Sequence, residues 1–411
     1  MKKAKLIIFI LIAIFTLFFS NDFGLIDVEK TSIITAVAID KDQDGYIVTA
    51  QIAVPEATDQ NSENRKAEIS GKGKTVGEAL KNTGDISGWF PKLAFCNLII
   101  LGNGLTEDNV VKVLDYFAKT LRVQDSALVA LAEKEGKELL SLSTPLDNIS
   151  SFALQKILLK NPGFDRDVYS MDIKTFCSGH YSPSKSAFMP MIKVIKSDAS
   201  DSGQSSSSGQ SSGSGSSSQS GSGGSGSSGQ SSDGGQKNKN LFDARTTALF
   251  LDGIKVGELD PELTFMFNAF TMPLTDNNVS VDKVPYKNGE CNYLLTVLKS
   301  NPKIEVSAND KTLDVTLKLS LYCKVSDVNA DDNEEALSQN NPLPQPLTKR
   351  AKEMLTERTN ELVQTSVQTG CDFLKIKEKL YRFNNKQYSK YKDNYLSVMN
   401  VKVNIDVYGQ S

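Results

Sequence analysis

The chain has 411 residues, of which 39% are hydrophobic and 23% are charged, and its formal net charge is −3. This length and apolar content allow two or three globular domains, and the charge balance gives no indication of a nucleic-acid partner. An odd number of cysteines excludes a fully paired disulfide framework, so we expect free buried thiols. The five cysteines are Cys96, Cys177, Cys291, Cys323 and Cys371.

The chain begins with Lys2, Lys3 and Lys5, followed by an unbroken apolar run. The run consists of Leu6, Ile7, Ile8, Phe9, Ile10, Leu11, Ile12, Ala13, Ile14, Phe15, Thr16, Leu17, Phe18 and Phe19. This pattern is typical of an export signal or an anchor, and it places the rest of the chain outside the cytoplasmic membrane. As a helix the run would be about 21 Å long, against roughly 30 Å of bilayer hydrocarbon, which favours a signal-peptide core. No A-x-A cleavage pattern precedes Ser20, so an uncleaved anchor is the alternative.

In the first region, the apolar runs Ile33–Ile39 and Tyr46–Val54 flank an Asp- and Gly-rich turn and predict a β-hairpin. Thr75 and Glu78 form a capping box at the start of one helix, and Thr106 is expected to cap another. Further elements are expected as strands over 98–101 and 127–131, a helix with Val110, Val113, Leu114, Phe117 and Leu121 on one face, and a short helix over 135–142. The remaining residues up to Ile195 show a less regular pattern.

A segment from residue 197 to residue 240 consists almost entirely of Ser, Gly and Gln. Because it has few apolar side chains to bury, it cannot offset the entropy of ordering, and we predict a disordered linker there. The linker divides an N-terminal α+β domain over 25–195 from a C-terminal α+β region over 241–411, and its reach would let the two move independently. The C-terminal region could comprise a small domain, 241–300, and a larger one, 301–411.

In the second region, apolar residues occupy every second position from Leu313 to Val325, which is typical of a half-buried strand. A polar loop over 340–346 leads into a helix over 347–368, which Gly370 ends. The apolar stripe of this helix is Leu347, Ala351, Leu355 and Leu362. The chain ends in an alternating strand around Val401–Val407, which we expect to pair with the earlier strand. The predicted fold class is α+β, with mixed and antiparallel sheets and packed helices.

One acidic segment and one glycine-rich segment match known ligand-binding motifs only in part. The carboxylates of Asp40–Asp44 match the start of a calcium loop, but Gln51 stands where a bidentate acid is required, so a hairpin turn explains them. The segment Gly71–Thr75 is similar to the end of a phosphate loop, but Glu68 replaces its first glycine, and a turn before the Thr75 cap explains it. We therefore expect no metal and no cofactor.

His180 is the only histidine, so a histidine-rich zinc site is excluded and any Ser–His–Asp or Cys–His arrangement would depend on this residue. Cys177 is three residues away, but the surrounding Ser-Gly-His-Tyr-Ser-Pro sequence predicts a loop without an oxyanion site. We expect no catalytic residue. His180 is the first residue to substitute under the hypothesis of an exported enzyme.

Near the C terminus, basic residues are interleaved with aromatic ones. The apolar members, between Phe373 and Tyr395, are expected to form core. The basic members are a candidate contact surface for anionic lipid headgroups or an acidic partner, with a merely solvated face as the alternative. This basic surface consists of Lys375, Lys379, Arg382, Lys386 and Lys390.

Several segments, in order, resemble the Ger(x)C family of spore germination proteins, the C subunits of germinant receptors. They are Leu25–Lys30, Ile34–Asp40, Thr75–Leu80, Leu114–Arg122, Thr247–Leu259, Gly370–Leu374 and the final strand. The resemblance implies an α+β fold of several domains outside the spore inner membrane and no catalysis. It also implies assembly with the integral membrane A and B subunits of a nutrient receptor, whose germinants include amino acids.

The chain departs from this family where the lipid should be attached. Family members usually carry a lipid-modified cysteine just after the apolar run, whereas the first cysteine here is Cys96, so no lipidation residue is assigned. The run Leu6–Phe19 would then itself hold the protein at the membrane. We predict a non-enzymatic, membrane-associated receptor subunit. The alternative is an exported solute-binding or surface-adhesion module unrelated to germination.

Overall fold

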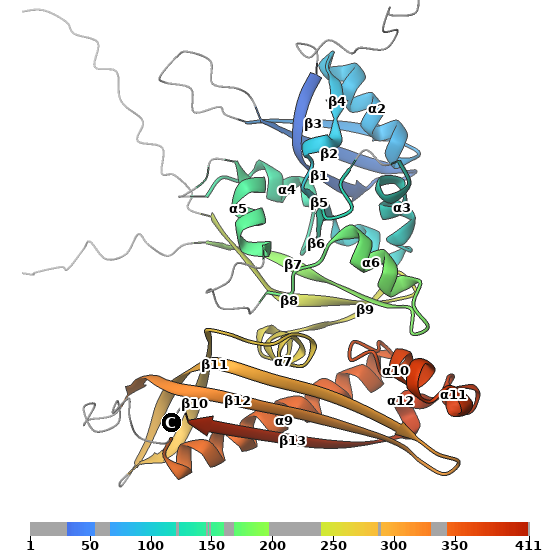
Figure 1. Cartoon of the computed structure of the whole chain (residues 1–411). Helices are drawn as coiled ribbons and strands as arrows, with labels where there is room; N and C mark the ends of the chain where they lie inside the picture. Colours follow the sequence, from blue (N-terminus) through green and yellow to red (C-terminus); the bar gives the residue numbers. More distant parts are fainter. Residues whose placement is uncertain are drawn as a thin grey trace, which may run out of the picture.

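The computed structural model describes residues 31–53, 66–120, 123–144, 147, 149–159, 168–196, 240–286, 289–329 and 343–409. These residues form two β-sheets packed against helices, and the second sheet lies beyond the β8–β9 edge of the first (Figure 1). The predicted anchor, Leu6–Phe19, and the predicted linker up to residue 239 lie outside the described residues. Among the helices that are described, none is both long and apolar enough to cross a membrane.

The first sheet is mixed and has nine strands among the described residues. In spatial order they are β3 (Lys66–Gly73), β2 (Tyr46–Ala53), β1 (Thr31–Lys41), β5 (Leu98–Leu101), β6 (Leu128–Ala132), β7 (Ser186–Lys196), β8 (Asn240–Leu251) and β9 (Ile254–Leu259), with β4 (Phe90–Lys92) beside β1. Strands β1, β5, β6 and β7 pair in parallel, and antiparallel pairs complete both edges. The predicted hairpin of β1 and β2 is confirmed.

Helices cover both faces of the first sheet, which explains why every residue of β5 and β6 is buried. One face packs against α2 (Val76–Ser87), α3 (Val111–Thr120) and α6 (Ile173–His180). The other face packs against α4 (Gly136–Ser141) and α5 (Ser150–Leu158). The stretch before Ile195, which was expected to be less regular, contains α5, α6 and most of β7.

The helix caps confirm one prediction and correct another. The Thr75 hydroxyl accepts the Glu78 N–H, which confirms the predicted cap, but the Glu78 carboxylate accepts the N–H of Lys74, one residue before the Thr75 N–H that a capping box uses. Thr106, in contrast, lies in the short helix η3 (Asn103–Glu107) and does not cap α3. The side-chain oxygen of Asn109 accepts the Val111 N–H at 2.9 Å instead, so the predicted start was several residues early.

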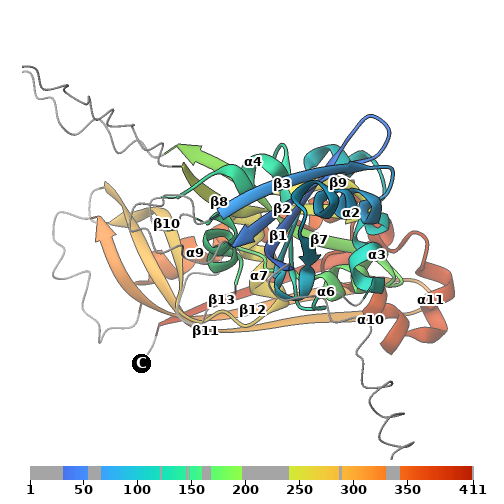
Figure 2. The ribbon, with the colours of Figure 1, turned by 90° about the horizontal axis from the view of Figure 1, so that it is seen from above.

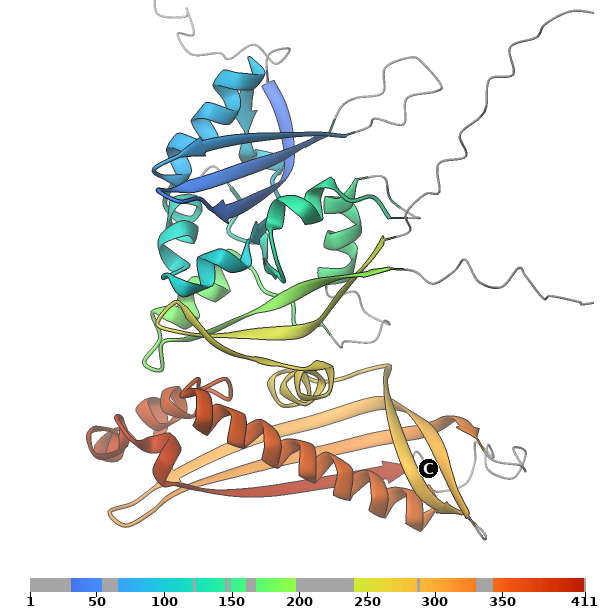
Figure 3. The same ribbon diagram turned by 180° about the vertical axis from the view of Figure 1, so that it is seen from behind.

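The second sheet lies beneath the first when the molecule is viewed from above (Figure 2). Its order is β10 (Asn277–Tyr286), β11 (Gly289–Ala308), β12 (Leu313–Asn329) and β13 (Met399–Gly409). The terminal strand pairs with β12, as predicted, in parallel. Helix α9 (Gln345–Thr369) runs along one face of this sheet with its predicted stripe buried (Figure 3). The chain then forms α10 (Ile376–Phe383), α11 (Asn385–Tyr391) and α12 (Tyr395–Val398).

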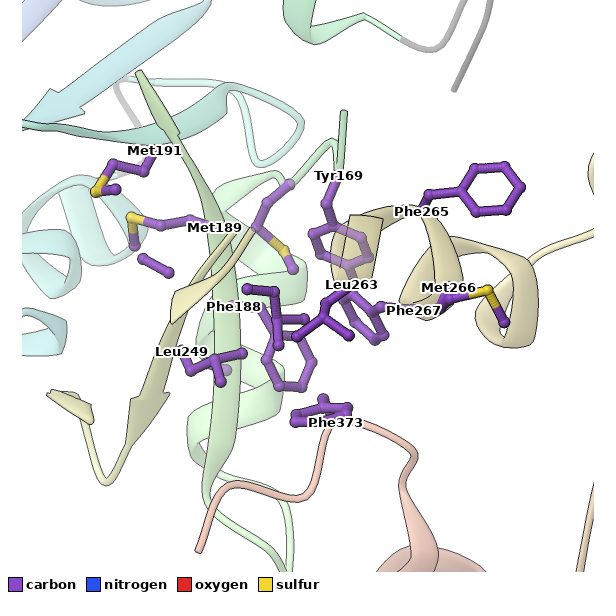
Figure 4. Packing of buried hydrophobic residues seen from close by; sticks show 14 of the residues in the cluster. Tyr169, Phe188, Met189, Met191, Leu249, Leu263, Phe265, Met266, Phe267 and Phe373 are labelled. Atoms are coloured by element: carbon purple, nitrogen blue, oxygen red, sulfur yellow. The ribbon is translucent and has the colours of Figure 1, made fainter. Parts of the chain in front are cut away.

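Helix α7 (Pro261–Thr271) lies between the two sheets, and every residue from Leu263 to Phe270 is buried. The ring of Phe267 lies 4.6 Å from that of Tyr169 and 5.2 Å from that of Phe188, measured between centroids (Figure 4). On its other side the same ring lies 5.7 Å from that of Phe373, which follows α9. The sheets therefore share one apolar core through this helix.

The pairing of β7 with β8 differs from the expected division of the chain. These strands pair antiparallel from Ser186–Leu251 to Lys196–Asn240, so they meet across the predicted linker. Residues 240–259 thus complete the first sheet rather than begin an independent unit, and β11 crosses the suggested boundary at 300. Strand pairing and the shared core hold the regions together, which corrects the expectation that they move independently.

Candidate functional site

The segment Gly370–Leu374 joins the two sheets. Gly370 ends α9 in the left-handed conformation, with φ of 68°, as the sequence predicted. The Cys371 thiol donates to the Phe250 carbonyl at 3.5 Å, and the Asp372 N–H donates to the Ser186 hydroxyl at 2.9 Å. Because Phe250 and Ser186 belong to β8 and β7, this segment fixes the end of α9 against the first sheet.

Asp372 is fully buried within this joint. Its carboxylate accepts the Ile376 N–H at 2.9 Å and the Lys377 N–H at 2.8 Å, so it caps the N-terminus of α10. Burial nevertheless dominates, and it raises the pKa of Asp372 to about 6. The Tyr395 hydroxyl hydrogen-bonds to the same carboxylate, and burial together with Asp372 raises the pKa of Tyr395.

A cleft of 460 Å³ opens beside Asp372, between α6, the start of β7 and α10. The Ser184 hydroxyl donates to Glu378 Oε1 at 2.7 Å across this joint. Glu378 Oε2 is buried and has no hydrogen-bond partner among the described residues. The cleft therefore presents hydroxyl groups on one wall and the charged face of α10 on the other.

The structure brings together only part of the predicted basic surface. Lys375, Lys379 and Arg382 line the cleft along α10. Lys386 is exposed on α11, and Lys390, also on α11, donates to the Asp310 carbonyl and lies 5.5 Å above the Tyr391 ring. Lys390 is therefore tied to the loop between β11 and β12 and is less free for a partner.

The interleaved aromatic residues divide between core and surface. Phe373, Tyr391 and Tyr395 are buried, as predicted. Tyr381 and Phe383 are 48% and 78% exposed, so the expectation that the apolar members form core is wrong for these two. They lie on the exposed side of α10 among the basic residues.

Helix α6 extends to His180, and the expected loop begins only at Tyr181, where the chain turns. His180 Nδ1 lies 3.8 Å from Asp252 Oδ1 and has no hydrogen-bond partner among the described residues. Burial raises the pKa of the Cys177 thiol to about 11, and the nearby Asp115 adds to the shift. At neutral pH this thiol is protonated, so it is a poor nucleophile.

The acidic turn after β1 does not converge on a cation. The Asp40 carboxylate points inward and accepts the Gly136 N–H at 2.7 Å and the Lys137 N–H at 3.0 Å, while burial raises its pKa. Asp42 instead pairs with Lys72 at 2.9 Å. Within the described ranges, no three His, Cys, Asp or Glu side chains are grouped to hold a metal ion.

The glycines of the Gly71–Thr75 motif have a packing role. Gly71 and Gly73 lie in β3, not in the expected turn, and a Cβ on Gly71 would lie 2.3 Å from the Ala79 carbonyl oxygen. A Cβ on Gly73 would lie 2.4 Å from the Ala79 nitrogen. The glycines therefore allow α2 to lie directly on β3, and the motif has no loop to hold phosphate.

Sequence reasoning missed Asp372, Ser184 and Glu378 as parts of the joint. A charged residue between Cys371 and Phe373 gives no sign of burial, because buried and exposed aspartates look alike in a sequence. The available signal was the position of Asp372 just after a helix-ending glycine and four residues before the apolar face of the next helix.

Two family models match the chain. The model described as "Spore germination protein N-terminal domain" matches residues 25–194, and that described as "Spore germination B3/ GerAC like, C-terminal" matches residues 245–409. The solved structure titled "Crystal Structure of the GerBC protein" is similar, with 14% sequence identity and a TM-score of 0.49, over 94% of this chain and 100% of that one. No curated protein matches the sequence.

Proposed function

Because the chain belongs to the GerAC-like family of spore germination proteins, we propose that it acts as the non-enzymatic C subunit of a nutrient germinant receptor. The observation that carries this proposal is the match of both family models, in order, to the two parts of one chain. In this role the protein presents surfaces to the integral membrane A and B subunits and transmits or supports the response rather than catalysing a reaction.

We infer that the protein lies on the extracytoplasmic side of the spore inner membrane. The run Leu6–Phe19 with its preceding lysines supports this location. Because no cysteine occurs before Cys96, attachment would depend on the apolar run and not on a lipid. Mass spectrometry of the mature protein tests this: an intact N-terminus supports the anchor, whereas a start near Asn21 contradicts it.

For the partner surface we propose the exposed parts of α10 and α11. Arg382 and Lys386 are exposed there beside the exposed rings of Tyr381 and Phe383. Arginine and aromatic residues are enriched at protein interfaces, and exposed basic side chains favour an acidic patch on the partner.

Charge reversal tests this surface. The double variant Arg382→Glu and Lys386→Glu should lose co-purification with the A and B subunits. Lys324→Glu, which reverses an exposed charge on β12, serves as the matched control and should retain it. Equal recovery of the subunits with both variants would contradict the proposed surface.

The germination role is tested in spores of the host. Deleting the gene should abolish or strongly slow germination triggered by the cognate nutrient, and the wild-type gene should restore it. His180→Ala should restore it equally, since His180 faces Asp252 and the neighbouring Cys177 thiol is protonated. Normal germination after deletion, with no related gene to compensate, would contradict the receptor role. Failure of the His180 variant in a correctly folded protein would favour an enzyme.

A further inference from the structure

A group of large apolar side chains is exposed at the end of the first sheet. Ile86 is 69% exposed, Phe95 54%, Trp89 48%, Phe90 42% and Ile33 40%. They come from the end of α2, from β4 with the preceding turn, from the short helix η2 (Leu93–Phe95) and from the start of β1. We call these five residues the aromatic tip; the elements that carry it lie at the end of the molecule farthest from the second sheet (Figure 1).

The local backbone holds these side chains outward. Gly88, with φ of 71°, ends α2 and turns the chain into β4. Strand β4 pairs in parallel with β1, placing Phe90 opposite Thr31 and Lys92 opposite Ile33. Residues in register across neighbouring strands share a face, so Phe90, Lys92 and Ile33 face the same way. The next residues, Leu93 and Cys96, turn inward and are buried, so the core does not need the outward-facing rings.

The first residue that the structure describes lies next to the aromatic tip. Thr31 is the first described residue, and it is paired with Phe90 of the tip. The segment between Phe19 and Thr31 can span at most about 40 Å when fully extended. If Leu6–Phe19 is held in the membrane, the aromatic tip is therefore the part of the fold tethered closest to the bilayer.

We propose that the aromatic tip lies on the outer surface of the membrane, with its rings at the level of the lipid headgroups. This inference rests on the proposed membrane attachment and adds the orientation of the folded part. Tryptophan is favoured at the membrane–water interface because its ring is apolar and its N–H can remain hydrated. The exposed Lys92 lies on the same face of β4 as Phe90, where it can meet anionic headgroups.

This orientation leaves the basic surface free for protein partners. Helices α10 and α11 lie beside the second sheet, away from α2 and β4 (Figures 1 and 3). A protein standing on its tip would hold Arg382 and Phe383 above the membrane, where extracytoplasmic parts of the A and B subunits can reach them.

The chain offers an internal reporter, because Trp89 is its only tryptophan. The full chain is reconstituted into vesicles of phosphatidylcholine and phosphatidylglycerol, with or without bromine on the upper part of the acyl chains. We expect the protein to float with the vesicles, and the Trp89 emission to be shifted to shorter wavelength and to be quenched by the brominated lipid.

The matched control moves the reporter to the basic surface. In the double variant Trp89→Phe with Phe383→Trp, the introduced tryptophan should remain exposed to water. Its emission should be quenched by aqueous iodide and not by brominated lipid. Equal quenching of both reporters would overturn the proposed orientation, because the molecule would then contact lipid over both regions.

The remaining outcomes separate this inference from the proposed function. If the chain floats with the vesicles but brominated lipid leaves Trp89 unquenched, the attachment stands and the orientation is wrong. A blue-shifted but unquenched Trp89 also overturns the inference, since the tip would be covered by protein. If the chain does not float, both the attachment and the orientation fail.

Discussion

The Asp372 side chain stabilises the joint between the two sheets through its hydrogen bonds, although its burial disfavours the charged form of the carboxyl group. Its two oxygens accept N–H groups at the start of α10, and these bonds favour the charged form. Burial opposes that form more strongly and leaves the pKa at about 6. The joint between the sheets therefore contains a group that changes charge near neutral pH.

The raised pKa of Asp372 predicts a pH dependence of stability. Between an unfolded pKa of about 4 and a folded pKa of about 6, the folded protein keeps a proton that the unfolded chain has lost. The stabilisation that comes from this retained proton is fully present at low pH, and it is lost as the pH rises from the unfolded pKa through the folded pKa. Relative to Asp372→Asn, the wild type should lose about 2 kcal/mol of unfolding free energy between pH 4 and pH 7. Urea unfolding at several pH values measures this difference, and a constant difference would contradict the prediction.

Gly71 gives a second prediction at a single residue. Its substitution by alanine places a Cβ 2.3 Å from the Ala79 carbonyl oxygen and 2.6 Å from the Thr83 nitrogen, both backbone atoms. Helix α2 must then shift from β3, and we expect Gly71→Ala to cost about 2 kcal/mol or more. Gly289→Ala is the control, since no described residue apart from its chain neighbours has an atom within 4 Å of its added Cβ, and it should stay within about 0.5 kcal/mol of the wild type. Equal midpoints in urea would show that α2 does not lie on β3 in this way.

The long amphipathic elements could be predicted from the sequence because their periods persist over many residues. The alternation in β12 and the stripe of α9 both lie where predicted, with Leu347 and Leu355 buried. The start of α3 was misplaced because Thr106 and Asn109 both belong to the residue types favoured at helix caps. The helical end at His180 was missed because tertiary packing, and not local propensity, decides so short a helix.

The packing of α9 gives a prediction at the scale of an element. Leu362 is fully buried against the second sheet, whereas its neighbour Glu361 is exposed. Leu362→Ala should destabilise the protein by about 2 to 5 kcal/mol through lost burial and a cavity. Glu361→Ala should change stability by less than about 0.5 kcal/mol. Chemical unfolding of both variants tests the predicted stripe, and similar losses for the two would contradict it.

At the scale of the whole molecule, the pairing across the predicted linker could not be inferred from composition. A stretch rich in Ser and Gly suggests a domain boundary whether it joins two domains or two strands of one hairpin. Only the register of Lys196 with Asn240 distinguishes these cases. The candidate site was missed for a related reason, since Ser186 and Asp372 meet through the stacking of distant parts of the chain.

This pairing predicts that the segment 197–239 can be replaced by a two-residue Asn-Gly turn. Lys196 and Asn240 are already paired in an antiparallel ladder, which a tight turn can close. Shortening the connection should stabilise the fold by about 2 kcal/mol through lower loop-closure entropy. The shortened chain should unfold at equal or higher urea concentration. A shortened chain that fails to fold would contradict the hairpin of β7 and β8.

The receptor role itself is tested most directly by capturing the tagged full chain from detergent-solubilised spore inner membranes and identifying what co-purifies. We predict that integral membrane A and B subunits of one nutrient receptor co-purify with it, and that Arg382→Glu with Lys386→Glu removes them while Lys324→Glu does not. Recovery of the wild-type chain without such subunits, from membranes in which those subunits are present and intact, would contradict the account.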